Sequence, residues 1–315
     1  MKITKKQVDK YACSGGREWF AAKFPQGGEY GEIIQALNAD RHYEWARWGA
    51  SQAYELFLLG KTTSEFIGAE TAATDAMVDE LNSIEFPPDQ VDVSSDKGED
   101  GARIGSSGNG AQIGSSGNGA RIGSSGYGAR IGSSGNDARI GSSGNDAQIG
   151  SSGYGAQIGS SGNDAQIGSS GNGAQIGSSG NGARIGSSGY DARIGSSGND
   201  AQIGSSGNGA QIGSSGNGAR IGSSGYGARI GSSGNDAQIG SSGNDARIEA
   251  AGENSVVAAA GSIARLVLGE GGCAAVPYHD GERTRFALAV VGENGIQAGV
   301  AYSVDDNGQF VEIEE

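Results

Sequence analysis

Ala102-Arg-Ile-Gly-Ser-Ser-Gly-Asn-Gly110 is the first copy of a nine-residue unit that repeats to residue 248 without an insertion or deletion. The unit reads Ala-(Arg/Gln)-Ile-Gly-Ser-Ser-Gly-(Asn/Tyr)-(Gly/Asp), and its isoleucine recurs at every ninth residue from Ile104 to Ile248. Sixteen full units are followed by a seventeenth that loses the pattern after Ile248. Self-similarity at a fixed short period is typical of a solenoid.

Each unit predicts a short strand followed by a corner. Alanine and isoleucine stand two residues apart, so they share one face of an extended strand, with Arg or Gln on the other face. The Gly-Ser-Ser-Gly-Asn-Gly that follows is turn chemistry, because glycine and asparagine tolerate positive φ and serine hydrogen-bonds nearby backbone. We therefore expect a mainly β protein, a parallel β-solenoid of the β-helix or β-roll type.

A disordered Gly/Ser linker is the alternative interpretation, since the chain contains 61 glycines. A flexible linker has no need of an isoleucine in strict register, which favours the solenoid. If two units form one coil, eight coils at about 4.8 Å each give a rod of about 40 Å.

The unit resembles in part the calcium-binding nonapeptide of parallel β-rolls, Gly-Gly-x-Gly-x-Asp-x-apolar-x. Here serine replaces the second glycine, and the apolar residue comes one place later. Calcium requires several oxygen ligands, yet the ligand-position aspartate occurs in only seven units, as Asp137, Asp146, Asp164, Asp191, Asp200, Asp236 and Asp245. We expect Gly and Asp to be interchangeable turn residues, and we expect neither an obligatory metal nor a cofactor.

Two positions of the unit vary and are the candidates for a binding face. The outward position is Arg in nine units and Gln in the others, and Tyr replaces Asn in four corners. Arginine and aromatic side chains dominate protein-binding surfaces, although solvated surface positions also drift between repeats. The candidate residues are Arg121, Arg130, Arg139, Arg184, Arg193, Arg220, Arg229, Tyr127, Tyr154, Tyr190 and Tyr226. With two units per coil, Tyr154, Tyr190 and Tyr226 would lie on one edge and Tyr127 on the other.

The net charge of −14 is concentrated at the two ends of the chain. Residues 101–248 carry nine Arg against seven Asp, so the sides of the rod are nearly neutral. Direct DNA binding is not expected, because an acidic protein repels phosphate. Mimicry of DNA by the rod is not expected either, because that would require acidic sides and these sides are nearly neutral. The two cysteines, Cys13 and Cys273, form no disulfide framework and indicate a reducing compartment. No signal peptide or membrane span is visible.

Residues 1–85 predict an α-helical domain. We expect a helix from Thr4 to Tyr11, a break at Ser14-Gly-Gly, and a second helix that carries Trp19 and Phe20 and ends before Pro25. Further helices are expected around Ile33 and Leu37, over residues 41–59, and from Thr62 or Thr63 onward. The three tryptophans, Trp19, Trp45 and Trp48, are expected in the core of this domain.

Residues 86–101 read as an acidic connector, and residues 102–262 as the solenoid with its terminal coils. Residues 263–315 predict a small β domain that caps the last coil, with strands over 265–268, 273–278, 285–291, 300–304 and 310–313. The hairpin dipeptides Asp280-Gly281, Asn294-Gly295 and Asn307-Gly308 lie between these strands. Such a cap would protect an open sheet edge from aggregation.

The Ile-Gly-Ser-Ser-Gly repeats, with Val291-Gly-Glu-Asn-Gly-Ile296 and Asn307-Gly-Gln-Phe-Val-Glu312, resemble uncharacterised phage and prophage proteins. The N-terminal Ala12-Cys-Ser-Gly-Gly-Arg-Glu-Trp-Phe20 and Trp45-Ala-Arg-Trp48 resemble a helical segment of such proteins. This resemblance implies an origin in a mobile element and a location in the host-cell cytoplasm. It implies no activity and no site residues.

The sequence shows no catalytic constellation, so we do not expect an enzyme. His42 and His279 have no zinc-ligand spacing, the serines occur as pairs in corners, and no phosphate-binding loop with its lysine is present. We expect a non-enzymatic protein that binds and inhibits or sequesters a host protein, plausibly a defence component. The alternative is a structural, self-assembling or virion-associated scaffold; ice or carbohydrate binding is favoured less. A homo-oligomer through the N-terminal helices or the solenoid edge is expected.

Overall fold

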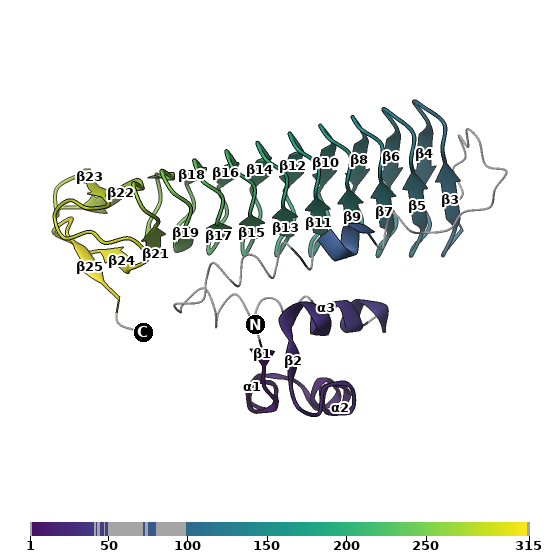
Figure 1. Ribbon diagram of the computed structural model, residues 1–315, viewed down its shortest axis with the longest axis horizontal. Helices are drawn as coiled ribbons and strands as arrows, with labels where there is room; N and C mark the ends of the chain where they lie inside the picture. The colour runs from purple at the N-terminus through teal and green to yellow at the C-terminus, as the bar shows by residue number, and fades with distance from the viewer. Residues whose placement is uncertain are drawn as a thin grey trace.

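The computed structural model confirms a mainly β protein built around a parallel β-solenoid, with helices before it and antiparallel strands after it (Figure 1). The structure describes residues 2–40, 42, 45–46, 48–49, 72, 75–79 and 99–313. Within the repeat, each strand pairs in parallel with the strand 18 residues further along, as Ile167 does with Ile185. One coil therefore contains two nine-residue units, and the 20 strands β3 to β22 make ten coils.

The two strands of every coil belong to two different sheets. The covered sheet, as we name the 12-stranded one, ends in the antiparallel strands β24 and β25. Its parallel strands are β3 (Arg103–Ser106), β5 (Arg121–Ser124), β7 (Arg139–Ser142), β9 (Gln157–Ser160), β11 (Gln175–Ser178), β13 (Arg193–Ser196), β15 (Gln211–Ser214), β17 (Arg229–Ser232), β19 (Ala246–Ala250) and β21 (Ile263–Leu268).

The open sheet, as we name the 11-stranded one, ends in the antiparallel strand β23. Its parallel strands are β4 (Gln112–Ser115), β6 (Arg130–Ser133), β8 (Gln148–Ser151), β10 (Gln166–Ser169), β12 (Arg184–Ser187), β14 (Gln202–Ser205), β16 (Arg220–Ser223), β18 (Gln238–Ser241), β20 (Val256–Ala259) and β22 (Cys273–His279).

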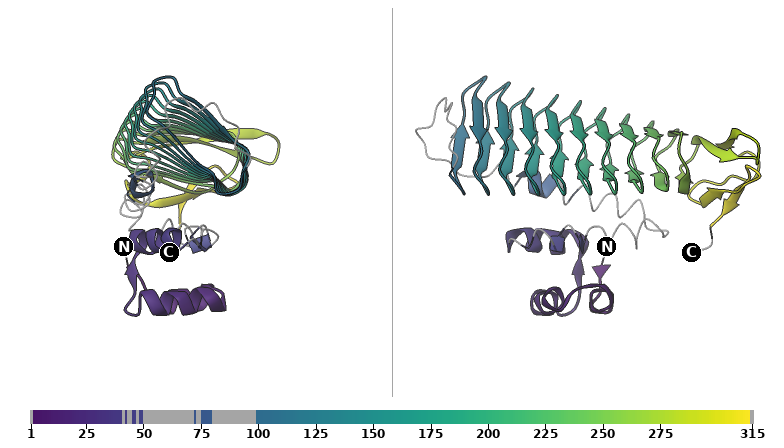
Figure 2. Two further views of the ribbon diagram at one scale, coloured as in Figure 1. Left: turned by 90° about the vertical axis from the view of Figure 1, so that its right-hand side faces the viewer. Right: turned by 180° about the vertical axis from the view of Figure 1, so that it is seen from behind.

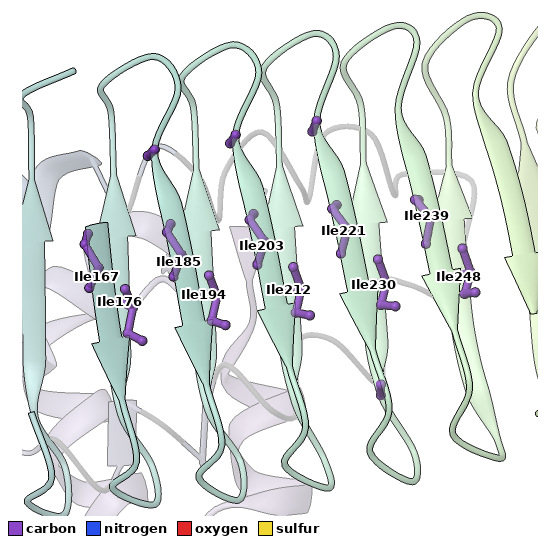
Figure 3. Close-up of a cluster of buried hydrophobic side chains, with 14 of the residues drawn as sticks. Ile167, Ile176, Ile185, Ile194, Ile203, Ile212, Ile221, Ile230, Ile239 and Ile248 are labelled. Atoms are coloured by element: carbon purple, nitrogen blue, oxygen red, sulfur yellow. The ribbon is translucent and has the colours of Figure 1, made fainter. Parts of the chain in front are cut away.

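The core lies between the two sheets and consists of stacked identical residues. The isoleucines of both sheets form two facing columns, and all those from Ile104 to Ile248 are buried (Figure 3). The unit's alanine is also buried throughout from Ala111 to Ala246. The first serine of each pair points inward as well, and fourteen of these buried hydroxyls, from Ser124 to Ser241, have no hydrogen-bond partner in the described part of the chain.

The corners depend on two different glycines. At the third residue before each alanine from Ala120 onward, a Cβ would lie under 3.0 Å from a carbonyl oxygen one coil below, as Gly198 would from that of Gly180, so only glycine fits. At the residue directly before the alanine the backbone is left-handed, with φ of 64–71° at glycines and 52–57° at the seven aspartates. Both residue types reach this conformation, as the sequence predicts.

Asparagine ladders join the corners of successive coils. Asn163 Oδ1 accepts a hydrogen bond from the backbone N–H of Asn181 at 3.0 Å, and Asn181 Oδ1 accepts one from Asn199 at 2.9 Å. Each tyrosine supplies no such acceptor, so the ladder is interrupted at every corner where Tyr stands.

The sheets continue past residue 262 before the antiparallel strands begin. β21 pairs in parallel with β19, and β22 pairs in parallel with β20. β23 (Thr284–Val290) then returns antiparallel to β22, while β24 (Ala301–Val304) and β25 (Phe310–Glu312) extend the covered sheet. All five strands expected from the C-terminal sequence are present, and two of them belong to the last coil.

The N-terminal region holds α1 (Lys5–Tyr11), α2 (Ser14–Lys23) and α3 (Tyr30–Ala39), with β1 (Lys2–Ile3) pairing antiparallel to β2 (Gly28–Glu29). Thr4 caps α1 together with Gln7, as predicted. The predicted break at Ser14-Gly15-Gly16 is wrong, because α2 begins at Ser14 and the chain is extended at Ala12 and Cys13. Gly15 instead lets α2 pack closely, since a Cβ there would lie 3.3 Å from the Trp45 ring.

A small aromatic core holds these helices together. Phe20, Ile33, Leu37 and Ala46 are buried, and Trp19 and Trp45 pack against them, whereas Trp48 is exposed. The expected helix over residues 41–59 is described only at Trp45, Ala46, Trp48 and Gly49, which are helical. The helix expected from Thr62 or Thr63 and the connector over 86–98 lie largely or wholly outside the described residues; of that stretch, only residues 72 and 75–79 are described, and they are helical.

Candidate protein-binding face

The two sheets carry the same side chains on their outer faces but differ in what covers them. In the covered sheet Gln157, Gln175, Arg193 and Gln211 are buried. In the open sheet the residues at the same position of the repeat, including Arg184 and Gln202, are exposed. The N-terminal helices lie along one side of the rod in each view (Figure 2).

Two hydrogen bonds connect the N-terminal region to the covered sheet. Arg193 Nη2 donates to the hydroxyl oxygen of Tyr30, the first residue of α3, at 3.4 Å. Ser197 Oγ donates to Asp75 Oδ1 at 2.8 Å. Tyr30 is fully buried, and burial raises the pKa of the Asp75 carboxyl above its usual value. Arg193 and Ser197 belong to one repeat unit, so a single Arg-Ile-Gly-Ser-Ser segment receives both a tyrosine and a carboxylate.

The open sheet repeats this segment without a cover. The segments Arg130–Ser134, Arg184–Ser188 and Arg220–Ser224 have the same sequence and the same strand geometry as Arg193–Ser197. The arginine and the second serine are exposed in all three of them. We name these three segments, with the sheet surface between them, the open face.

A shallow trough runs along the open face over a column of glycines. The trough has a volume of about 1700 Å³ and is bordered by the Gln/Arg column, and a second hollow of about 720 Å³ adjoins it beside the exposed serines. The column continues for eight coils as Gly114, Gly132, Gly150, Gly168, Gly186, Gly204, Gly222 and Gly240.

No backbone requirement explains glycine in this column. None of the eight has a positive φ, and at seven of them a Cβ would meet no atom of the described residues within 4 Å. Ala258 occupies the same position in β20, so a side chain fits there. Glycine weakens a strand interior, and it often marks a place where a ligand or another backbone approaches closely. The trough therefore has the character of a contact surface.

The structure does not bring all the candidate residues to one surface. Arg130, Arg184 and Arg220 lie on the open face, whereas Arg121, Arg139, Arg193 and Arg229 lie on the covered sheet and are half-buried or buried. Tyr154, Tyr190 and Tyr226 are exposed in the corners that follow the open-sheet strands. Tyr127 lies in the opposite row of corners, as the 18-residue coil requires.

Two of the four tyrosines pair with carboxylates of the next coil. The Asp146 side chain hydrogen-bonds the Tyr127 hydroxyl and raises its pKa, and Asp245 does the same for Tyr226. Both tyrosines remain more than half exposed, so the interactions fix their rings without burying them.

Residues capable of acid–base or metal chemistry do not gather in the described part of the chain. No group of three or more His, Cys, Asp or Glu side chains is close enough there to hold a metal ion. His42 stacks on Trp45 at 4.2 Å between ring centroids, and His279 Nδ1 accepts a hydrogen bond from the Gly281 N–H in a hairpin turn. Among the same residues no helix has the length and apolar character needed to span a membrane.

Sequence reasoning missed the residues that distinguish the two faces. Tyr30 and Asp75 carry no local signal, since neither belongs to a motif. The glycine of the trough is also the glycine of the covered sheet, because both sheets are built from one unit. The sequence pattern therefore identifies the binding segment, but it does not show which of the two sheets leaves that segment exposed.

The comparisons with known proteins find similarity in the N-terminal part of the chain. Residues 1–58 match the family described as the YdhT N-terminal domain. An uncharacterized protein of Escherichia coli strain K12, YdhT, is 60% identical over 47 residues, which are 15% of this chain and 17% of that protein. No solved structure matches the chain. The similarity lies outside the solenoid and says nothing of the open face.

Proposed function

We propose that the protein is a non-enzymatic binding protein that holds a partner protein along its open face. The observation that carries the proposal is the repetition of one segment in two settings. Arg193–Ser197 binds a tyrosine and a carboxylate from the N-terminal region, and Arg130–Ser134, Arg184–Ser188 and Arg220–Ser224 offer the same donors to solvent.

The chemistry of the partner follows from these donors. The guanidinium and hydroxyl groups donate hydrogen bonds to oxygen acceptors, as Arg193 does to the Tyr30 hydroxyl and Ser197 does to Asp75. On an exposed face, where burial does not penalise the charge, such donors favour carboxylates and tyrosine hydroxyls. The glycine trough accepts a closely approaching main chain or helix. A protein surface that presents an acidic, tyrosine-bearing helix fits both features.

The resemblance of the repeats to phage and prophage proteins adds a proposed origin, location and biological role. On that basis the protein comes from a mobile element, acts in the host-cell cytoplasm, and inhibits or sequesters a host protein, plausibly a defence component. This part of the proposal rests on the resemblance alone, whereas the binding face rests on the geometry.

Affinity capture from a bacterial lysate at moderate salt tests the proposal. The baits are the full chain, Arg184→Glu/Arg220→Glu and Gly204→Val on the open face, and Arg103→Glu as the control. Arg103 is exposed at the same position of the repeat but lies on β3 of the other sheet. We expect a stoichiometric protein with the full chain and the control, and its loss with both open-face variants.

Two outcomes would contradict the proposal. Capture of no protein above background would argue against a soluble partner in that host. A partner that all four baits retain equally would place its binding surface away from the open face. Far-ultraviolet circular dichroism of each bait would confirm that the solenoid is intact, which we expect because all four substituted positions are exposed.

A structural or self-assembling role is the second candidate function. It is favoured by one separate observation, the exposed terminal strand of the open sheet, and predicts self-association or presence in purified particles.

A further inference from the structure

An apolar patch continues the open sheet beyond the trough. Phe286, Leu288 and Val290 of β23 point outward and are 59%, 71% and 38% exposed, and Val256 of β20 is 46% exposed. The register of β20, β22 and β23 aligns them with Ala275 and Pro277 on the same face. Surface hydrophobics scattered singly are ordinary, but a contiguous apolar group at the end of a sheet marks an interaction site.

β23 is also a sheet edge with free backbone groups. It pairs with β22 and with no other strand of the described residues. The Val291 N–H bonds the Gly272 carbonyl on the β22 side, so by strand alternation the N–H groups of Phe286 and Leu288 point to the open edge. These edge groups lie in the strand that carries the most exposed apolar side chains.

The strand lacks the usual protections against edge pairing. Proteins block exposed edges with proline, lysine, bulges or very short strands. β23 has seven residues, contains neither proline nor lysine, and pairs with β22 in unbroken register; its one charged residue, Arg285, is paired with Asp280 of the same hairpin. The other terminal edge differs, since β25 has only three residues and ends at Glu312.

We propose that two copies of the protein pair antiparallel through β23 and form a two-fold symmetric dimer. Antiparallel pairing of a strand with its own copy is two-fold by construction, so the same donors and acceptors meet twice. Centred on Leu288, the pairing sets Leu288 opposite its symmetry mate and Phe286 opposite Val290. Cross-strand apolar pairs of this kind stabilise sheets.

Charge selects this register. Arg283 precedes β23, and Glu293 follows it in the next turn. A pairing centred on Leu288 places Arg283 of each copy at the same end of the interface as the turn that carries Glu293 of the other copy, so the two ends of the interface attract. Arg285 is already engaged by Asp280 across the hairpin turn, which leaves Arg283 as the basic group at this end.

The dimer would join two rods end to end at their open sheets. Because the symmetry axis is perpendicular to a continuous sheet, both glycine troughs face the same side. A partner with two binding sites would then be held by both copies, which raises its effective affinity. The dimer itself does not depend on the open face having a partner, and the variants below leave the trough unchanged.

Light scattering after size exclusion, together with sedimentation equilibrium, tests the proposal on the full chain. We expect a mass of twice 31.5 kDa for the unchanged protein. Leu288→Lys should weaken the dimer by at least about tenfold, the loss of a central apolar contact. Val311→Lys is the control, because Val311 is also an exposed apolar residue, on β25 and outside the interface.

A charge exchange tests the register. Arg283→Glu and Glu293→Arg should each weaken the dimer, because each places like charges together. The double variant should restore the dimer, because the two opposite charges have then only exchanged places. A protein that is monomeric at every concentration would overturn the proposal. A dimer that survives Leu288→Lys, or that the charge exchange does not restore, would place the interface elsewhere.

Discussion

The carbonyl oxygen of Gly180 occupies the space that a side chain on Gly198 would need, one coil above it. A Cβ on Gly198 would come under 3.0 Å from this oxygen, a separation that real Cβ atoms do not adopt. The same relationship recurs in both rows of corners along the whole rod. The corner glycine thus permits the close stacking of the coils, whereas the trough glycine is not needed for it.

Replacement of the two glycines by alanine should therefore have opposite results. We expect Gly198→Ala to lower the free energy of unfolding by about 3 kcal/mol or more, because backbone must move to relieve the overlap. Gly204→Ala should leave stability unchanged or raise it by about 0.5–1 kcal/mol. Far-ultraviolet circular dichroism during denaturation measures both. Equal effects of the two substitutions would show that the corner contact is not limiting.

The buried serines predict stabilisation by removal of a polar group. Ser205 is buried, and its hydroxyl has no partner in the described residues. Ala250 and Ala259 replace the equivalent serine in the last coils and pair in the same register, so alanine fits. Ser205→Ala should raise the free energy of unfolding by about 1 kcal/mol, since an unsatisfied buried hydroxyl costs about 1–3 kcal/mol.

The matched control for this substitution is Ser206→Ala, which removes an exposed hydroxyl from the same corner. It should change stability by less than about 0.5 kcal/mol. A loss of stability in Ser205→Ala would instead reveal that the inner hydroxyls have partners, such as an ordered file of water between the sheets. Denaturant midpoints of both variants decide between the two.

The nine-residue unit contains nearly all of the information for the rod. The Ala-x-Ile alternation predicts the strand, Gly-Ser-Ser-Gly-Asn predicts the corner, and the unbroken period predicts the stack. The unit cannot tell the two sheets apart, because every strand of the repeat has the same sequence pattern whichever sheet it joins. The covered sheet is distinguished by its contacts with Tyr30 and Asp75. These residues lie far from the repeat in the sequence and belong to no periodic pattern, so the sequence does not reveal the contacts.

A buried ion pair marks the end of the repeat. Glu249 stands where earlier units have glycine, and it pairs with Arg265 at 3.2 Å with both side chains almost fully buried. Removal of one partner leaves a buried charge without its counter-charge. Arg265→Ala should therefore lower the free energy of unfolding by about 3–5 kcal/mol. Arg265→Ala/Glu249→Gly, which also restores the glycine of the repeat, should be more stable than Arg265→Ala alone.

The exposed pair of Lys23 and Asp40 is the control for this prediction. Their separation of 3.0 Å is similar, but the side chains are 49% and 31% exposed. Lys23→Ala should therefore cost less than about 1 kcal/mol. A cost for Arg265→Ala as small as that for Lys23→Ala would show that solvent reaches the Glu249 carboxylate.

The contact of Asp75 with Ser197 predicts how pH affects attachment of the N-terminal region. Burial raises the pKa of Asp75, and the neighbouring Asp79 adds to the rise. A carboxyl with a raised pKa in the folded state favours folding when protonated and opposes it when ionised. Asp75 therefore weakens the folded state at neutral pH, and this penalty disappears as the pH falls through the carboxyl range.

Asp75→Asn should stabilise the N-terminal region at pH 7, because an amide oxygen still accepts the Ser197 hydrogen bond without a charge. The gain should shrink toward pH 4, where Asp75 itself becomes protonated. All three tryptophans lie at positions 19, 45 and 48, so tryptophan fluorescence follows this region separately from the solenoid. Asp79→Asn, a change at an exposed carboxylate, is the control and should shift the fluorescence midpoint less. A gain for Asp75→Asn that is equal at pH 4 and pH 7 would exclude the ionised carboxylate as its cause.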